Sequence, residues 1–402
     1  MMTINLARAA KKSRISYSQI INDILGVINV CIVIVWSDKA SLVTVVQMLF
    51  AAVAFYNAYM SKQKINIICL WAFIFYGFCI MSILWAYSTS GALLYRNTML
   101  KMMLLVFSVS LYAKTKREID ILLKSFILGT AILAVMLFVS TPIELWGTER
   151  LGAELEMNQN AVGAIFVYAS MLCMYYARKT NPYFLLFVVF ASISMFTGSR
   201  RAFLMILLII IIFFFSKLKK LSDVLYIIPF GLLIFLLIYS SMNIPLLYNV
   251  LGRRLETLFN FFSGEGRVDN STIIRMELIS SGIEQFKERM LIGHGLNSFK
   301  YLNRYDLYAH NNYVELLVNY GLIGTVLYYS MILAIMIRAF IALVTKAHME
   351  VLPVLIVGAA LIGDFGTVSY YSVRTIILLI IAYQIGNVSD GYASDTLGQA
   401  VV

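Results

Sequence analysis

The segment 293–325 carries the residues best suited to acid–base chemistry. It contains a Gly-His-Gly sequence around His294 and an Ala-His-Asn sequence that ends at Asn311. An imidazole titrates near neutral pH, so His310 is a candidate general base; the alternative is an interfacial histidine that caps a helix. The glycines around His294 predict a turn, which makes that histidine a weaker candidate. Asn311 and Glu315 are four residues apart and share a helix face, where they are candidates for substrate binding.

A second segment, 197–204, reads Thr-Gly-Ser-Arg-Arg-Ala-Phe-Leu and places Arg200 and Arg201 just before an apolar stretch. If that stretch is a helix, its dipole and the two guanidinium groups together favour an anion there. The alternative is a flank that only sets topology.

A third segment, 150–163, begins with Arg150 and brings Asn158 and Asn160 to the start of another apolar stretch. Amides at this place can hydrogen-bond a sugar or cap the helix, and the residue type favours capping.

The composition around these segments indicates a membrane protein. Of the 402 residues, 61% are hydrophobic and 13% are charged, and the mean hydropathy is +0.83. Charges buried in hydrocarbon cost several kcal/mol each, which explains their scarcity. The net charge of +11 fits basic cytoplasmic loops better than nucleic-acid binding.

Apolar stretches of spanning length recur along the chain, so the sequence predicts an all-α polytopic membrane protein with about twelve transmembrane helices. The predicted spans are 20–36, 41–60, 65–85, 98–113, 119–140, 158–177, 183–197, 202–216, 221–239, 313–337, 350–363 and 368–386. The predicted regions are a cytoplasmic N-terminus (1–19), nine helices (20–239), an extracytoplasmic loop (240–312), three helices (313–386) and a polar, disordered cytoplasmic tail (387–402).

The distribution of basic residues supports this topology. With both termini inside, the inner segments hold 16 cations and the short outer loops hold six. The basic N-terminus precedes a full-length span without a small-residue cleavage site, which predicts an uncleaved first helix in the bacterial cytoplasmic (inner) membrane. All four cysteines lie in apolar spans, and their spacing predicts neither a disulfide framework nor a metal site.

The long outer loop contains two stretches with helical periodicity, 253–262 and 274–291. In the second, Ile279, Ile283, Phe286 and Met290 recur at the spacing of one helix face. Short amphipathic helices of this kind commonly lie in the membrane interface.

The type of cation differs between the two sides. Inside, 11 of the 16 cations are lysine, whereas outside, 11 of the 14 are arginine. Arginine binds phosphate or carboxylate through a planar fork, so the outer arginines, among them Arg267, Arg275 and Arg374, indicate an anionic ligand. The alternative is that these arginines extend to the interface or pair with nearby acids.

Several other kinds of chemistry lack their signatures. The sequence contains no phosphate-binding glycine loop between a strand and a helix and no zinc-type cluster of Cys and His. We therefore expect no metal and no other cofactor. Few ionisable residues lie deep in the spans, which disfavours a proton-coupled transporter.

The motifs taken together resemble those of the O-antigen ligase and Wzy polymerase superfamily. The resemblance rests on His310-Asn311 followed after nine residues by Gly321-x-x-Gly324, on Gly-Ser-Arg200 opening a helix, and on Arg275 some twenty residues before a Gly-x-Gly sequence. The second Thr that often follows Gly-x-x-Gly-Thr in ligases is Val326 here.

The resemblance implies a metal-independent, inverting membrane glycosyltransferase that uses glycans linked through diphosphate to a polyprenol. It assigns catalytic roles to His310, Arg200 and Arg275, with Arg201 as an adjacent alternative to Arg200. The substrate-binding candidates are Arg201, Arg150, Arg267, Asn160, Asn311, Glu315 and Arg374.

The predicted function is therefore a polysaccharide polymerase that extends a polyprenyl-diphosphate-linked chain. Its predicted partners are undecaprenyl-diphosphate-linked oligosaccharides, membrane lipids, a chain-length regulator and a flippase, with no nucleic acid. One alternative is an O-antigen ligase that moves the chain to a lipid A core. The other is a flippase for lipid-linked oligosaccharides, which makes no bond. The sequence leaves open whether the polymer is capsule, exopolysaccharide or O-antigen.

Overall fold

The computed structural model describes residues 16–37, 39–145, 150–155, 157–177, 182–215, 227–253, 255–256, 270–344 and 351–399. Every regular element in these ranges is helical, which confirms the predicted fold class.

A helix coincides with each predicted span. These helices are α2 (Tyr17–Val35), α3 (Ala40–Met60), α4 (Ile67–Met81), α5 (Thr89–Tyr112), α6 (Lys116–Ser140), α7 (Gln159–Ala177), α8 (Pro182–Phe196), α9 (Arg200–Phe215), α10 (Ile227–Asn243), α15 (Asn312–Val344), α16 (Val351–Asp364) and α17 (Val373–Gln399). Short elements between them are η1 (Ser82–Trp85), η2 (Ile143–Leu145), α11 (Pro245–Leu247), the π-helical turn η4 (Tyr248–Gly252), α13 (Asn270–Glu288) and α14 (Ser298–Leu302).

The lengths and surfaces of these helices fit a membrane. In the described part of the chain, α2, α3, α4 with η1, α5, α6, α7 and α15 are long and apolar enough to cross one. Large apolar side chains lie on the outside, with Leu84 and Val139 more than 80% exposed. Lipid is the medium in which such a surface is stable. The count of about twelve spans stays a prediction.

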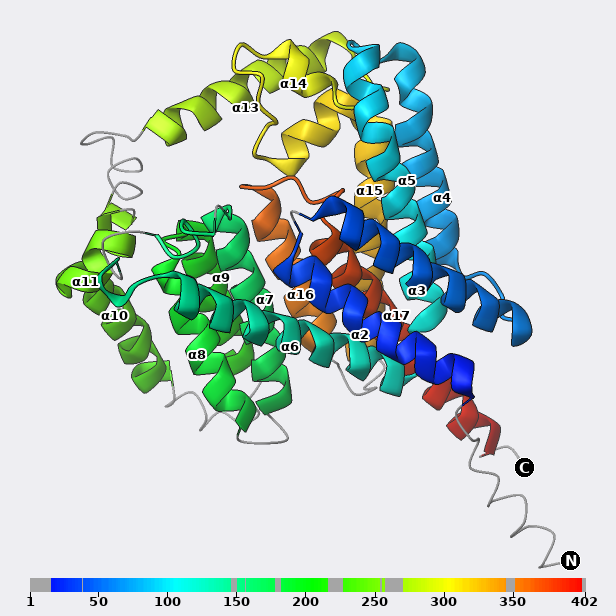
Figure 1. Ribbon diagram of the computed structural model, residues 1–402, viewed down its shortest axis with the longest axis horizontal. Helices are drawn as coiled ribbons and strands as arrows, with labels where there is room; N and C mark the ends of the chain where they lie inside the picture. The colour runs from blue at the N-terminus through cyan, green and yellow to red at the C-terminus, as the bar shows by residue number, and fades with distance from the viewer. Residues whose placement is uncertain are drawn as a thin grey trace, which may run out of the picture.

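The first turn of α2 and the end of α17 lie on the same side of the molecule (Figure 1). The helix α17 continues to Gln399, so the prediction that the tail beyond 386 is disordered is wrong for its described part. No proline interrupts this stretch, so nothing in its backbone stops the helix.

The long loop carries α13, which confirms a helix in the predicted 274–291 stretch, whereas most of the 253–262 stretch lies outside the described residues. The predicted apolar face of this stretch is confirmed in part, because Ile279 and Phe286 pack against the cluster that contains Leu278. Leu278 and Gly282 are buried against α15, while Ile283 and Met290 are nearly half exposed. A Cβ atom at Gly282 would lie 2.3 Å from Val314, so this glycine lets the two helices approach and selects the face.

The helix α15 is kinked at Gly321, where φ is +65° and ψ is −163°. After the kink, the amide N–H groups of Leu322 and Ile323 donate to the carbonyls of Met290 and Leu291 at 2.8 and 3.1 Å. In a continuous helix these groups would donate to residues 318 and 319.

The carbonyls released on the other side of the kink are also used. Val318 and Asn319 accept hydrogen bonds from the amides of His294 and Gly295, each at 2.8 Å. The loop 290–295 therefore takes over the backbone hydrogen bonds that α15 gives up. Each group remains paired although the helix is broken, as a low-polarity environment requires.

Glycines make this close contact possible. A Cβ at Gly293 would lie 2.6 Å from the backbone of Asn319, and one at Gly321 would lie 2.4 Å from Leu291. Both residues also have a positive φ. Gly324, the second glycine of the Gly321-x-x-Gly324 motif, also allows a close contact, because a Cβ there would lie 3.2 Å from Phe78 of α4.

The same loop contacts the start of α5. The His294 carbonyl accepts from the Tyr87 amide at 3.0 Å, and the Asn297 side chain donates to the Gly91 carbonyl at 3.2 Å. Figure 1 shows α13 and α14 beside the upper ends of α4 and α5. A small apolar cluster that includes Leu278, Phe299 and Val318 holds the loop onto α15. The loop is thus a fixed cap at one end of the helices, which we call the loop face.

Replacing Gly321 by alanine should destabilise the fold by about 2 kcal/mol or more, since it adds a steric overlap to a backbone that L-residues rarely adopt. Thermal unfolding in detergent measures the effect. The matched control is Gly77→Ala in α4, where a new Cβ meets nothing within 4 Å and helix propensity improves. Equal melting temperatures for the two variants would show that the kink is not constrained as described.

Candidate active site

His310 lies in the last turn before α15, and its backbone is left-handed with φ +51°. The imidazole packs on the ring of Tyr308, with centroids 3.9 Å apart and planes at 38°. A non-glycine residue in this region is uncommon, and such strain clusters at functional sites.

This turn is held by the side chains of Glu315, Asn319 and Asn311. The Glu315 carboxylate, only 2% exposed, accepts from the Ala309 amide at 2.7 Å and from the Asn319 side chain at 3.1 Å. The Asn311 oxygen accepts from the amides of Tyr313 and Val314, which caps α15. The contacts place Glu315 and Asn311, both predicted to bind substrate, in positions that fix His310.

Asn312 fixes the first turn of α15 from the other side. Its side chain is fully buried, donates to Asp364 at 3.1 Å, and accepts from the amides of Ser369 and Tyr370. The buried Asp364 carboxylate also accepts from the Tyr329 hydroxyl at 2.7 Å. The His310 turn is therefore tied to the segment between α16 and α17.

Arg201 reaches the same segment from α9. Its guanidinium donates to the Gly363 carbonyl at 3.0 Å and to the Asn160 carbonyl at 3.4 Å. Each bond uses one donor of a group that has five, so donors remain for a ligand. Arg200, Arg275 and His310 are not among the residues that line the cavity described next, and His310 adjoins it through its contact with Tyr308.

A cavity of about 480 Å³ lies beside these residues. Its polar wall contains the guanidinium groups of Arg201 and Arg374, and its aromatic wall contains Tyr95, Tyr308 and Tyr371. The rest of the lining is mixed. Its apolar residues are Val33, Val43, Ala161, Ala164, Ile165, Met205, Val368 and Val373, and the others are Ser37, Asn158, Tyr168, Gly363, Thr367, Ser372 and Thr375. A cavity that combines two arginines, several hydroxyl groups and an apolar part suits an amphiphilic anion with hydroxyl groups of its own.

The pKa of His310 is shifted by its burial and by the charges around it. Burial and the positive charges of Arg275 and Arg201 lower the pKa of His310 to about 4. The imidazole is therefore neutral at neutral pH and can accept a proton. Burial also raises the pKa of the neighbouring Tyr308 hydroxyl, although both arginines oppose the shift.

The third predicted segment has a structural role in the described contacts. Arg150 donates to the Thr197 carbonyl at 2.7 Å and to the Asn160 side chain at 3.0 Å, which joins the start of α7 to the turn before α9. Asn158 accepts from the amides of residues 160 and 161 and so caps α7, as its residue type favoured. Arg267 lies outside the described residues.

His294, the weaker sequence candidate, is structural in its contacts. It is 5% exposed, and its Nε2 atom lies 2.9 Å from the Gln285 carbonyl. This contact fastens the turn to α13.

Residues 185–329, which are 145 of the 402, match the family model described as O-Antigen ligase. This segment is similar to that family. The resemblance inferred from the motifs is thereby confirmed, and it implies a membrane protein that handles glycans in the manner of a ligase or polymerase. The matched segment of the superfamily contains Arg200, Arg201, Arg275 and His310. No curated protein matches the chain.

The remainder of the cavity comes from outside the O-antigen ligase segment. Tyr95, Tyr371 and Arg374 line the cavity and lie beyond the match, as does Asp364, which holds the first turn of α15. Sequence reasoning missed Asp364, although a lone carboxylate at the end of an apolar stretch is a usable signal. It also missed the tyrosines, which nothing in the sequence separates from the other members of a set of 25.

Replacing Arg201 by alanine should weaken the binding of farnesyl diphosphate about tenfold or more, because a charge-assisted hydrogen-bonding group is lost. Isothermal titration calorimetry of the detergent-solubilised protein measures the affinity. Arg200→Ala is the matched control and should change it less than threefold, a small effect on this scale. A larger loss in Arg200→Ala than in Arg201→Ala would reverse the assignment.

Proposed function

We propose that this protein is a polysaccharide polymerase. It transfers a growing glycan from a polyprenyl diphosphate to a hydroxyl of a lipid-linked repeat unit. The observation that carries the proposal is the cavity in which Arg201, Arg374 and Tyr308 meet beside the His310 turn.

In this reaction the acceptor hydroxyl attacks the anomeric carbon of the donor. The bond from that carbon to the diphosphate oxygen breaks as the new glycosidic bond forms, with inversion. His310 takes the hydroxyl proton, and the polyprenyl diphosphate leaves with the bonding electron pair. Arg201, Arg374 and Arg275 stabilise the charge on the leaving group without a metal.

The walls of the cavity fit the two parts of such a donor. Sugars present C–H groups on their ring faces, and the three tyrosine rings offer flat surfaces and hydroxyl groups for them. The apolar wall suits the first units of the polyprenol. Holding both substrates by their lipids in one membrane makes the encounter local.

A second candidate function is O-antigen ligation, which the description of the matched family favours. The donor chemistry is the same, and only the acceptor differs. The departure at Val326 from the Thr-Thr pair frequent in ligases favours the polymerase, and the Thr325 hydroxyl donates to the Gly321 carbonyl at 2.7 Å within the kink of α15.

The glycan ladder of a strain that lacks this gene tests the proposal. We expect single repeat units at the surface and no long chains, restored by the wild-type gene and not by His310→Ala. Long chains that persist on their lipid carrier without reaching a final acceptor would identify the protein as the ligase. Lipid-linked units that accumulate on the cytoplasmic side would identify a transporter and exclude catalysis.

The pH dependence of glycosyl transfer tests the role of His310. The base must be neutral, and its pKa of about 4 in the free protein predicts a kcat/KM that falls only as the pH approaches 4. In the complex with the donor, the negative diphosphate offsets the arginine charges and raises the pKa of His310. The kcat profile should therefore fall at a higher pH than the kcat/KM profile.

The variant Arg275→Gln tests whether the acidic limb comes from the titration of His310 or from a general loss of activity in acid. It removes one of the charges that lower the pKa, so the acidic limb of kcat/KM should move up toward the ordinary value of 6.5. Arg289→Gln, on the same loop, is the control and should leave the limb in place. A limb that stays fixed in Arg275→Gln would remove His310 from the base role.

A further inference from the structure

A second cavity, of about 500 Å³, lies at the opposite end of the helices from the loop face. Its walls are the first turns of α2, the turn at Ser61 and Gln63 after α3, and Lys114 between α5 and α6. Gln19 lines this cavity and Val33, on the same helix, lines the candidate active site. Their separation along α2 is roughly 21 Å at 1.5 Å per residue.

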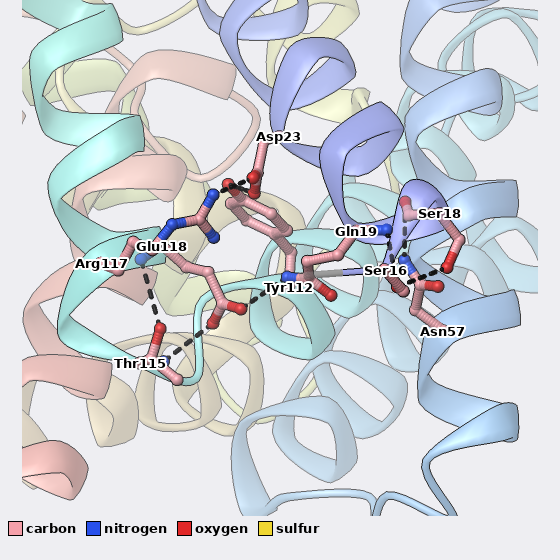
Figure 2. A network of polar contacts seen from close by, with 9 residues as sticks. All are labelled: Ser16, Ser18, Gln19, Asp23, Asn57, Tyr112, Thr115, Arg117 and Glu118. Atoms are coloured by element: carbon pink, nitrogen blue, oxygen red, sulfur yellow. Dashed lines mark hydrogen bonds and ion pairs between the residues drawn. The ribbon is translucent and has the colours of Figure 1, made fainter. Parts of the chain in front are cut away.

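The walls of this second cavity are fixed by a polar network (Figure 2). The Glu118 carboxylate accepts from the Gln19 side chain at 2.6 Å and from the amides of Lys114 and Thr115 at 2.9 Å. Asp23, one turn further along α2, accepts from Tyr112 at 2.8 Å and pairs with Arg117. The carboxylates near the cavity are thus engaged within the protein.

One acceptor in the cavity wall is different. The Asn22 side chain is 2% exposed and lines the cavity, and its Oδ1 atom accepts no hydrogen bond from the described residues. A buried acceptor left unpaired costs about 1–3 kcal/mol, so this atom calls for an N–H or O–H donor. The charged groups that line the cavity are Lys114 and Glu118, and Glu118 is already bonded. Glu118 interacts electrostatically with the Lys114 ammonium, but its hydrogen bonds come from Gln19 and from backbone amides. The N–H groups of the Lys114 ammonium are therefore left to bind an anion.

The rim of the cavity is apolar and faces outward. Tyr56 and Met60 of α3 line it and are 54% and 62% exposed. A cavity with a polar floor and an apolar rim, at the ends of spanning helices, lies where the head groups of a bilayer meet the acyl chains.

We propose that this cavity is a binding site for a phospholipid head group. The phosphate lies near the Lys114 ammonium, and an N–H or O–H of the head group donates to Asn22 Oδ1. The acyl chains run along Tyr56 and Met60. Ethanolamine and glycerol head groups both supply the donor, whereas choline has a phosphate and no N–H or O–H. This site does not depend on the glycan chemistry proposed above.

The test uses the full-length protein in vesicles of phosphatidylethanolamine, phosphatidylglycerol and phosphatidylcholine in equal parts. After extraction in mild detergent, mass spectrometry quantifies the lipids that remain bound. We expect one of the two donor lipids to be retained about tenfold over phosphatidylcholine, as a hydrogen bond to a buried acceptor implies. Which of them is retained identifies the head group. Asn22→Ala and Lys114→Ala should each remove the enrichment.

Two further variants control the test. Asn29→Ala removes another buried, unpaired amide oxygen of α2 that is not among the residues lining the cavity, so the enrichment should persist. Gln63→Trp fills the cavity from its edge without altering α2, so the enrichment should disappear in a folded protein. Equal retention of phosphatidylcholine, or enrichment that survives Asn22→Ala, Lys114→Ala and Gln63→Trp, would overturn the proposal.

Discussion

The structure depends on one exchange of backbone hydrogen bonds. At Gly321 the helix α15 breaks, and the loop 290–295 supplies both the donors and the acceptors that the break leaves unpaired. A broken helix inside a membrane is stable only where its polar groups find such partners. This exchange also matters for the candidate active site, because the loop 290–295 and the first turns of α15 support the segment that carries His310. The glycines at 293 and 321 are required by contact distance as well as by backbone conformation.

The candidate active site brings Arg201 and Arg275 close enough to His310 for their positive charges to disfavour its protonated form. Burial is the main cause of the lowered pKa of His310, and the positive charges of Arg275 and Arg201 act in the same direction. In the proposed reaction, a diphosphate donor would supply negative charge beside the arginines. The charges proposed to bind the donor would then also set the pKa of the base, which would link binding to proton transfer through electrostatics. Tyr95, Tyr308 and Tyr371 add flat aromatic surface to the cavity, which the arginines do not supply.

The sequence predicts the helices well because runs of apolar residues have few other folds in a membrane. It singles out His310 as a candidate base, since a motif with fixed spacing carries that residue, and this role stays a prediction. It could not choose between Arg200 and Arg201, because adjacent residues on a helix point about 100° apart and the rotation of α9 is set by packing. The sequence assigned Glu315 to substrate binding because it shares a helix face with Asn311. A shared face does not show which groups it contacts, and the Glu315 carboxylate accepts a hydrogen bond from the Ala309 amide. The packed face of α13 was predicted in part, since Ile279 and Phe286 pack as expected. The burial of Gly282 was missed because a glycine contributes no hydrophobic signal to a periodicity.

The central claim is that this chain alone forms a glycosidic bond from a polyprenyl-diphosphate donor. The direct measurement is a single-turnover reaction of the purified protein in liposomes with a synthetic lipid-linked repeat unit, with the release of polyprenyl diphosphate quantified beside the glycan products. The account predicts one polyprenyl diphosphate released for each new bond, and products at least one repeat unit longer than the substrate. Movement of the intact lipid-linked unit across the bilayer, with neither diphosphate release nor a longer glycan, would contradict it.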